Sequence, residues 1–311
     1  MSEFMTVSVS PHIKTNADTR RIMADVLIAL APAAIAGVVI FGLRALAVLL
    51  VSVASAVLAE FLFNLICRRP NTVGDRSAAV TGLLLGMNVP ANLPIWQAAV
   101  GSVFAIIIVK CLFGGIGKNF ANPAITARIF MTISFGAMAG AAFPTVVDTA
   151  SSATPLSAPE SIGTYSVTDL LLGLRGGAIG ETCGIALLIG FVYLLIRRVI
   201  TWHIPVSFVG CVFLLSFFME GMDAMMALRM ILSGGLLIGA IFMATDYVTS
   251  PSTAFGKVVF GLGAGALTVL IRYWGVYPEG VSFAILLMNI LNPYIDRWTK
   301  HKVLGVGGKK A

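Results

Sequence analysis

Asp148-Thr-Ala-Ser-Ser-Ala-Thr-Pro-Leu-Ser157 divides this chain of 311 residues into two apolar halves. The stretch is rich in hydroxyl groups, and no charged residue lies between Asp148 and Glu160. Ser and Thr side chains compete for backbone hydrogen bonds and Pro155 removes a backbone donor, so neither a helix nor a strand is favoured. We therefore expect a loop whose hydroxyl groups are candidates for covalent chemistry. A plain polar surface loop is the alternative.

The composition on both sides of this loop is typical of a membrane protein. Hydrophobic residues make up 58% of the chain, charged residues make up 11%, and the mean hydropathy is +0.95. Soluble domains carry about 25% charged residues, so we expect the lipid bilayer to be the solvent of this chain. Residues 1–18 have no apolar core, so we expect no cleavable signal peptide. The net charge of +7 indicates membrane topology and no binding of nucleic acid.

The cysteines give no sign of a metal site. None of them forms a CxxC pair, and all lie in or beside apolar segments: Cys67, Cys111, Cys183 and Cys211. We interpret them as small buried side chains, and we predict neither a disulfide nor a metal centre held by this chain alone.

Ten apolar segments follow one another, and all except the third are near the roughly 17–25 residues that a spanning helix needs. They cover residues 22–43, 45–66, 76–90, 94–112, 121–140, 180–197, 203–220, 225–245, 256–274 and 279–296. The third contains Arg76, Gly82, Gly86 and Pro90, with Asp75 directly before it, which predicts a short or broken helix. The sequence thus predicts an all-α polytopic membrane protein with about ten transmembrane helices.

The basic residues predict the orientation of the chain. If the N-terminus is cytoplasmic, most lysines and arginines fall inside or at the inner interface, and four fall outside: Arg44, Arg175, Arg229 and Arg272. An excess of basic residues marks the cytoplasmic side. Both termini are then cytoplasmic, and the loop of about residues 141–179 lies on the outer face.

Five spans in each half mean that the second half enters the membrane inverted, as in many transporters. The predicted organisation is a cytoplasmic segment (1–21), a first five-helix repeat (22–140), an outer loop (141–179), a second five-helix repeat (180–298) and a basic cytoplasmic tail (299–311). A weak internal similarity supports the repeat, because nine residues lead from Gly101 to Lys110 and from Gly263 to Arg272, each before a break. Chance similarity between two apolar helices is the alternative.

The first break, Gly114–Ala124, contains three glycines, two asparagines and a proline. Irregular backbone at membrane depth is tolerated only where it is buried in protein or lines a cavity. Asn119 and Asn122 offer amide donors and acceptors to the polar edge of a ring. The spacing does not match a phosphate-binding P-loop. Close helix packing is the alternative explanation for the glycines.

The few ionisable residues in or beside the apolar segments include Asp25, Glu60, Asp75, Arg128, Glu181, Asp246 and Glu279. Acids at such depth are costly, so they are candidates for function. Asp246 is the first candidate for an ion path, because no basic residue lies within ten positions before it. Asp25, Asp75 and Glu279 are further candidates. The alternative for Asp75 and Asp246 is that they cap a helix or lie at the membrane interface. The alternative for Glu181 and Glu279 is that they begin a helix, where a carboxylate suits the helix dipole.

Seven motifs between about Arg20 and Asp296 resemble, in their order, the NqrB/RnfD family. They are Glu60-Phe-Leu-Phe-Asn64, Pro94-Ile-Trp-Gln-Ala98, Phe113-Gly-Gly-Ile-Gly-Lys-Asn119 with Asn122-Pro-Ala124, Ser151-Ser-Ala-Thr-Pro-Leu156, Gly180-Glu-Thr182, Met243-Ala-Thr-Asp246, and Tyr277-Pro-Glu-Gly280 with Asn289. The short segment before the first span resembles RnfD-type members more than NqrB-type members. The resemblance implies a subunit of Rnf, a membrane complex that passes electrons between reduced ferredoxin and NAD and couples this to Na⁺ or H⁺ export.

The resemblance also implies two flavins. Family members esterify a Thr of an S-G-A-T-type motif with the phosphate of FMN, and Thr154 occupies that place, beside Ser151 and with Ser152 where Gly is usual. The flavin then carries the redox chemistry. A riboflavin is held without a covalent bond in the membrane part. Its candidate contacts are Lys118, Asn119, Asn122 and Arg128.

The implied partners are the other Rnf subunits, including a periplasmic-side flavoprotein subunit, a flavin transferase and the lipid bilayer of a bacterial or archaeal cell membrane. The chain would be one subunit of an ion-translocating oxidoreductase, with no complete active site of its own. Two other functions stay open: a secondary transporter or channel subunit without a redox role, and a structural membrane anchor for redox partners.

The predicted topology can be tested by labelling. A cysteine introduced near Ser157 should react with impermeant thiol reagents from outside, because loop 141–179 is predicted on the outer face. A cysteine near Lys300 should react only from inside. The reverse labelling pattern in cells would contradict the orientation drawn from the basic residues.

Overall fold

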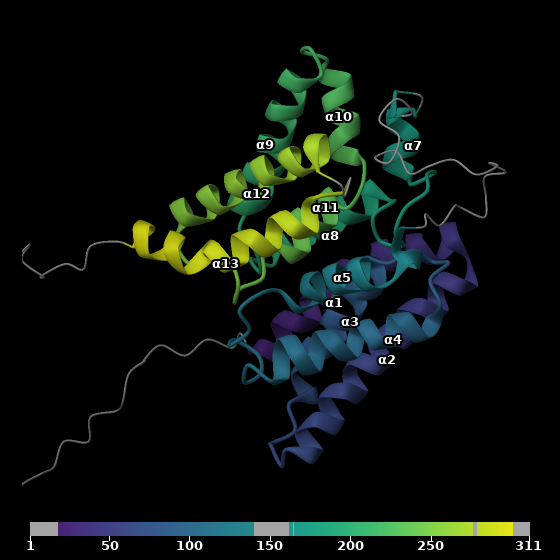
Figure 1. Ribbon diagram of the computed structural model, residues 1–311, viewed down its shortest axis with the longest axis vertical. Coiled ribbons are helices and arrows are strands. Elements are labelled where there is room, and N and C mark those ends of the chain that lie inside the picture. Colours follow the sequence, from purple (N-terminus) through teal and green to yellow (C-terminus); the bar gives the residue numbers. More distant parts are fainter. Residues whose placement is uncertain (1–17, 140–161, 164, 276–278, 301–311) are drawn as a thin grey trace, which may run out of the picture.

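The computed structural model describes residues 18–139, 162–163, 165–275 and 279–300, and within these residues all the regular elements are helices (Figure 1). In chain order they are α1 (Thr19–Phe41), α2 (Leu43–Ile66), η1 (Val73–Asp75), α3 (Ser77–Met87), α4 (Ile95–Phe104), η2 (Ala105–Cys111), α5 (Pro123–Ser134), η3 (Gly136–Ala139), α7 (Val167–Leu172), α8 (Gly184–Ile196), α9 (His203–Met219), α10 (Ala224–Leu232), α11 (Leu236–Ile238), η4 (Gly239–Met243), α12 (Ala254–Trp274) and α13 (Val281–Thr299). Two of them, η2 and η4, are π-helices. The predicted all-α architecture is confirmed.

Not every helix is long enough to be a spanning helix on its own. Among the described residues, α1, α2 and α12 are long and apolar enough to cross a membrane. The pair formed by α10 and residues 236–243 would make a fourth span, bent by 69° at the break between its halves. The third apolar segment forms α3, which has only 11 residues. The structure thus agrees with a multi-pass membrane protein, whereas it does not establish the count of ten full spans.

Three predicted segments are shortened by local structure. Segment 121–140 yields α5 and the short η3, because its backbone becomes extended at Phe135 between them. Segment 180–197 begins its helix at Gly184, four residues late, because Glu181 lies in a turn. Segment 225–245 is broken after α10, where Gly234 adopts a φ of +66°. In the last two cases the backbone beside the break is held by buried arginines, described below.

The helices fall into two groups that meet along two contacts (Figure 1). In the first group, α2 packs against α3 and α4; in the second, α12 packs against α9 and α13. Between the groups, α1 packs along α8 and α5 packs against α13. The interface between the two groups is therefore formed by α1 and α5 of the first group and by α8 and α13 of the second.

Glycine allows the closest of these approaches. A Cβ added to Gly190 of α8 would lie 2.3 Å from the carbonyl oxygen of Ala29 on α1. A Cβ added to Gly82 of α3 would lie 2.6 Å from the carbonyl oxygen of Ser52 on α2. Both are contacts with backbone, which cannot move aside easily. Small residues at helix interfaces are typical of membrane proteins.

The surface of the bundle is apolar. Large side chains that point outward include Leu43, Ile66, Ile196, Phe255 and Trp298, which are between 70% and 82% exposed. Such a surface would be costly in water and is the one that lipid requires. Polar side chains are instead gathered inside the bundle, where they form the candidate site.

Candidate functional site

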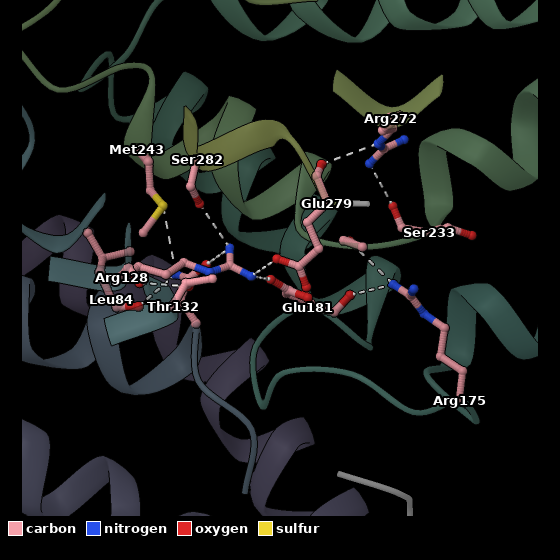
Figure 2. A network of polar contacts seen from close by, with 12 residues as sticks. Leu84, Arg128, Thr132, Arg175, Glu181, Ser233, Met243, Arg272, Glu279 and Ser282 are labelled. Atoms are coloured by element: carbon pink, nitrogen blue, oxygen red, sulfur yellow. Dashed lines mark hydrogen bonds and ion pairs between the residues drawn. The ribbon is translucent and has the colours of Figure 1, made fainter. Parts of the chain in front are cut away.

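A buried charge cluster joins the two helix groups, and Arg128 of α5 lies at its centre (Figure 2). Its Nη2 atom pairs with Glu181 Oε1 at 2.6 Å and with the carboxylate of Glu279. Its Nη1 atom donates to Asn88 Oδ1 at 2.9 Å and to Ser282 Oγ at 3.2 Å. The Arg128 side chain is only 6% exposed. A charge at this depth is tolerated because four side chains share it.

The start of α5 places Arg128. Asn122 caps this helix, because its Oδ1 accepts hydrogen bonds from the N–H groups of Ala124 and Ile125, with Pro123 at the first helical position. The Asn122 amide also donates to the carbonyl oxygen of Met243 at 3.2 Å. One side chain therefore fixes α5 to the end of η4.

Two further arginines hold the segments that carry the two glutamates. Arg175 donates to the carbonyl oxygen of Glu181 at 2.8 Å. Arg272 donates to the carbonyl oxygens of Ser233 at 3.1 Å and Glu279 at 3.4 Å. Arg175 is buried and Arg272 is partly buried. Chain breaks leave carbonyl oxygens without helical partners, and these guanidinium groups satisfy the acceptors. The predicted place of both residues on the outer side of the membrane stays a prediction.

A second buried ion pair lies within the first helix group. Lys110, in η2, pairs with Glu60 of α2 at 2.8 Å, and both side chains are at most 4% exposed. Lys110 Nζ also donates to Ser77 Oγ at 2.6 Å, and Thr72 Oγ1 donates to Glu60 Oε1 at 2.7 Å. From the sequence we expected Lys110 inside or at the inner interface. The structure buries it because Glu60 and Ser77 supply its partners.

Asp25 forms the third polar contact between helices. Its carboxylate on α1 accepts hydrogen bonds from Tyr193 Oη at 3.0 Å and Arg197 Nη2 at 3.2 Å. Tyr193 belongs to α8 and Arg197 follows it. This candidate ion-path acid is therefore balanced by a cation and strengthens the α1–α8 contact.

A cavity of about 330 Å³ lies between the two helix groups. Apolar side chains and a few polar groups line it: Thr19, Ile22, Met23, Val26, Ser77, Val80, Thr81, Leu84, Lys110, Ile116, Gly117, Asn119, Asn122, Pro123, Leu194, Val199, Ile200, Phe242, Thr245, Asp246, Tyr247 and Val248. Both π-helices contribute, η2 through Lys110 and η4 through Phe242. π-Helical turns occur frequently at functional sites.

The cavity brings together three of the predicted residues. Asn119 and Asn122 line it, as expected for the Gly-rich break, and Asp246 lines the wall from the second helix group. Asp246 accepts hydrogen bonds from Val248 N at 3.5 Å and Thr249 Oγ1 at 3.3 Å. It forms no ion pair with any residue that the structure describes. Its carboxyl group is thus available to a ligand or an ion.

Other predicted residues lie elsewhere. Lys118 is exposed, and neither it nor Arg128 is among the lining residues of this cavity. Asp75 accepts hydrogen bonds from Ser77 N and Oγ at 2.8 and 2.5 Å, in the turn just before α3. Glu279 belongs to the Arg128 cluster. The predicted flavin-loop residues fall outside the described residues: Ser151, Ser152 and Thr154.

Sequence reasoning missed the roles of Asn88, Arg175 and Lys110. The signal for Lys110 was present, because nine uncharged residues precede it in an apolar run. A base in such a run implies a buried acid as its partner. Asn88 gave no such signal, because an amide at a helix end is commonly a cap.

The Arg128 cluster yields a stability prediction. Replacing Arg128 with Gln leaves Glu181 buried without a cation and should destabilise the fold by about 3–5 kcal/mol. Lys in place of Arg128 should rescue only partly, because a single ammonium cannot reach four partners. Thermal unfolding in detergent measures both effects. The control is Arg44→Gln, since Arg44 is exposed and donates to a single carbonyl oxygen. Equal melting temperatures for Arg128→Gln and the control would contradict the proposed importance of the cluster.

Comparison with known proteins agrees with the resemblance seen in the motifs. The profile of the NQR2, RnfD, RnfE family matches residues 6–305. The D subunit of the Na⁺-translocating ferredoxin:NAD⁺ oxidoreductase complex of Acetobacterium woodii is 46% identical over 97% of this chain and 96% of the relative. The D subunit of the proton-translocating ferredoxin:NAD⁺ oxidoreductase complex of Clostridium ljungdahlii is 40% identical over 95% of this chain and 94% of the relative. The D subunit of the ion-translocating oxidoreductase complex of Stutzerimonas stutzeri is 36% identical over 92% of each chain. With this match over nearly its whole length, the chain belongs to the NQR2, RnfD, RnfE family.

Proposed function

We propose that this chain is the RnfD-type membrane subunit of an ion-translocating ferredoxin:NAD oxidoreductase and that it relays electrons through two flavins. The observation that carries the proposal is similarity over nearly the whole chain to relatives that are named as the D subunits of such complexes. Its partners are then the other subunits of the complex, including a flavoprotein subunit on the outer side, and a flavin transferase. The isolated chain would have no complete active site.

The first flavin of the proposal is FMN on Thr154. The support is the Ser151-Ser-Ala-Thr-Pro-Leu156 motif, since a hydroxyl group at Thr154 is what a phosphoester bond requires. The bond keeps the flavin at the membrane surface, from which it would otherwise diffuse away. The flavin supplies the electron transfer, and the chain supplies its attachment and surroundings.

The second flavin of the proposal is riboflavin in the cavity between the helix groups. The residues present fit such a ligand. Ligand cavities of about 300–1,000 Å³ are typical, and a wall of apolar side chains with a few polar groups suits a flat aromatic ring with a polar edge. Asn119 and Asn122 lie in this lining, and Lys110 and Asp246 bring one positive and one negative charge. In this proposal the apolar side chains exclude water and the polar side chains orient the ring.

We also propose that the two helix groups are inverted repeats. The supporting contacts are reciprocal: Glu279, just before α13, meets Arg128 within α5, and Asn122, just before α5, meets Asn289 within α13. The side-chain amide of Asn289 is assigned the orientation in which both its oxygen and its nitrogen form hydrogen bonds. Its oxygen then accepts from Asn122 N at 3.2 Å, and its nitrogen donates to the carbonyl oxygen of Thr249 at 3.1 Å. The packing of α2 on α4 likewise corresponds to that of α9 on α12. Two similar halves related by a two-fold axis would produce such pairs.

A secondary transporter or channel without a redox role is the competing function. Broken helices around a central cavity fit a transporter as well as the proposed redox subunit. The arrangement of helices therefore does not distinguish between these two functions. A flavin that stays with the purified chain favours the redox function. A purely structural anchor is the remaining alternative, and it predicts that electron transfer survives the loss of both flavins.

The covalent flavin is tested at its attachment residue. Thr154→Ala should abolish the covalent flavin and leave folding unchanged, because only a hydroxyl and a methyl group are removed. Ultraviolet fluorescence of the denatured protein on a gel and mass spectrometry of the loop peptide report the bond. Thr154→Ser retains a hydroxyl group and is the matched control. An unmodified Thr154 in protein made together with an active flavin transferase would contradict the assignment.

The ion path is tested at Asp246. If cation binding at this carboxylate compensates for an electron reaching the cavity, Asp246→Asn should lower the number of ions moved per electron and spare flavin binding. Ion flux in proteoliposomes containing the whole complex measures this ratio. Asp223→Asn is the control, because Asp223 is the exposed N-cap of α10, lies outside the lining of this cavity, and Asn caps a helix start about as well as Asp. Normal flux in Asp246→Asn would show that this side chain only stabilises its turn.

A further inference from the structure

We propose that the Lys110–Glu60 ion pair sets the reduction potential of the flavin in the cavity, with Lys110 as the group that stabilises the reduced form. The inference rests on the proposed riboflavin site and goes beyond it, because it assigns the control of the reduction potential to one ion pair and includes Glu60, which does not line the cavity. It follows from the position of the pair, its orientation and its burial.

The position comes from η2. This π-helix ends at Cys111, directly after Lys110, and Lys110 lies in the cavity lining. Its partner Glu60 lies on α2 and is not among the lining residues. Lys110 is therefore the member of the pair that borders the cavity, and Glu60 lies behind it.

The surroundings hold this orientation. Lys110 Nζ lies 2.8 Å from Glu60 Oε1 and 2.6 Å from Ser77 Oγ, and Ser77 begins α3. Thr72 Oγ1 donates to the same Glu60 oxygen at 2.7 Å. Both charged side chains are at most 4% exposed, so solvent screens the pair weakly. Reduction adds negative charge to the ligand, and a fixed, desolvated cation in the wall favours the state that carries it.

Asp246 acts in the opposite direction. It is the lining carboxylate, it comes from the second helix group, and no ion pair with a described residue neutralises it. When it is ionised, this carboxylate opposes reduction, and a proton or a bound cation removes that effect. The cavity thus lies between a permanent positive charge in one helix group and an acid that can be neutralised in the other.

The experiment measures the midpoint potential of riboflavin by spectroelectrochemistry in the purified full-length chain. A Thr154→Ala background removes the covalent flavin, so that only the flavin in the cavity is observed. Lys110→Gln should lower the potential, and Glu60→Gln should raise it, because the remaining charge of the pair acts alone in each variant. The ratio of reduced to oxidised flavin at a fixed potential should change by about tenfold in each direction. Lys257→Gln is the control, because Lys257 is partly exposed and lies outside the lining of this cavity.

Shifts of opposite sign in the midpoint potentials of Lys110→Gln and Glu60→Gln distinguish tuning from a structural role. Loss of packing alone would shift both potentials in the same direction. If an unpaired buried charge prevents folding, the double variant Lys110→Gln/Glu60→Gln removes both charges together. It should lower the potential relative to the parent chain, since the oriented pair is lost. A shift of the same sign in both single variants, or no shift in the double variant, would overturn the inference.

A separate variant tests the site itself. Met23 lines the cavity from α1 and is partly exposed, so Met23→Trp should fill part of the space and lower the riboflavin content. Unchanged riboflavin content in this variant would refute the proposed site and the tuning role with it. Reduced content, together with unshifted potentials in the Lys110 and Glu60 variants, would refute the tuning role alone.

Discussion

A charge inside an apolar helix bundle costs several kcal/mol unless another group compensates for it, and this constraint shapes the structure. Three buried acids meet it by pairing with a base from another helix or segment: Glu60 with Lys110, Glu181 with Arg128, and Asp25 with Arg197. Each pair fixes the positions of two segments. The Glu181–Arg128 and Asp25–Arg197 pairs connect the two helix groups, so they also determine how the groups meet.

The Arg128 cluster and the cavity are neighbouring parts of one arrangement. The amide of Asn88 accepts from Arg128 and donates to the carbonyl oxygen of Leu84, and Leu84 lines the cavity. Asn122 lines the cavity as well and caps the helix that carries Arg128. The cluster therefore supports one end of the space in which we propose that riboflavin binds. A polar cluster that is fully satisfied gives such a site a rigid wall.

Much of the fold could be predicted from the sequence, because an apolar segment in lipid must form a helix so that its backbone N–H and C=O groups are hydrogen-bonded. The predicted segment 45–66 and the observed α2 (Leu43–Ile66) differ by only two residues at one end. The predicted span over 225–245 is bent by 69° at a break, where Arg272 binds the carbonyl oxygens of Met230 and Ser233. Local sequence does not contain that contact, since the partners are 42 and 39 positions apart.

The candidate site could be predicted in part for a similar reason. Asn119, Asn122 and Asp246 were identified because polar residues at chain breaks are conspicuous in an apolar sequence. The pairing of Lys110 with Glu60 was not, because 50 residues separate them and either could have faced the membrane surface. Periodicity reveals which residues lie in the membrane, whereas the choice of partner for a buried charge depends on tertiary packing.

The proposed function requires above all that a flavin occupies the cavity between the helix groups, between Lys110 and Asp246. A cryo-electron microscopy map of the complex, prepared without added flavin, would reveal what fills this space. We predict flat three-ring density in the cavity, with its polar edge near Asn119 and Asn122. A cavity filled by lipid or by ordered water in a complex that transfers electrons would contradict the proposed function.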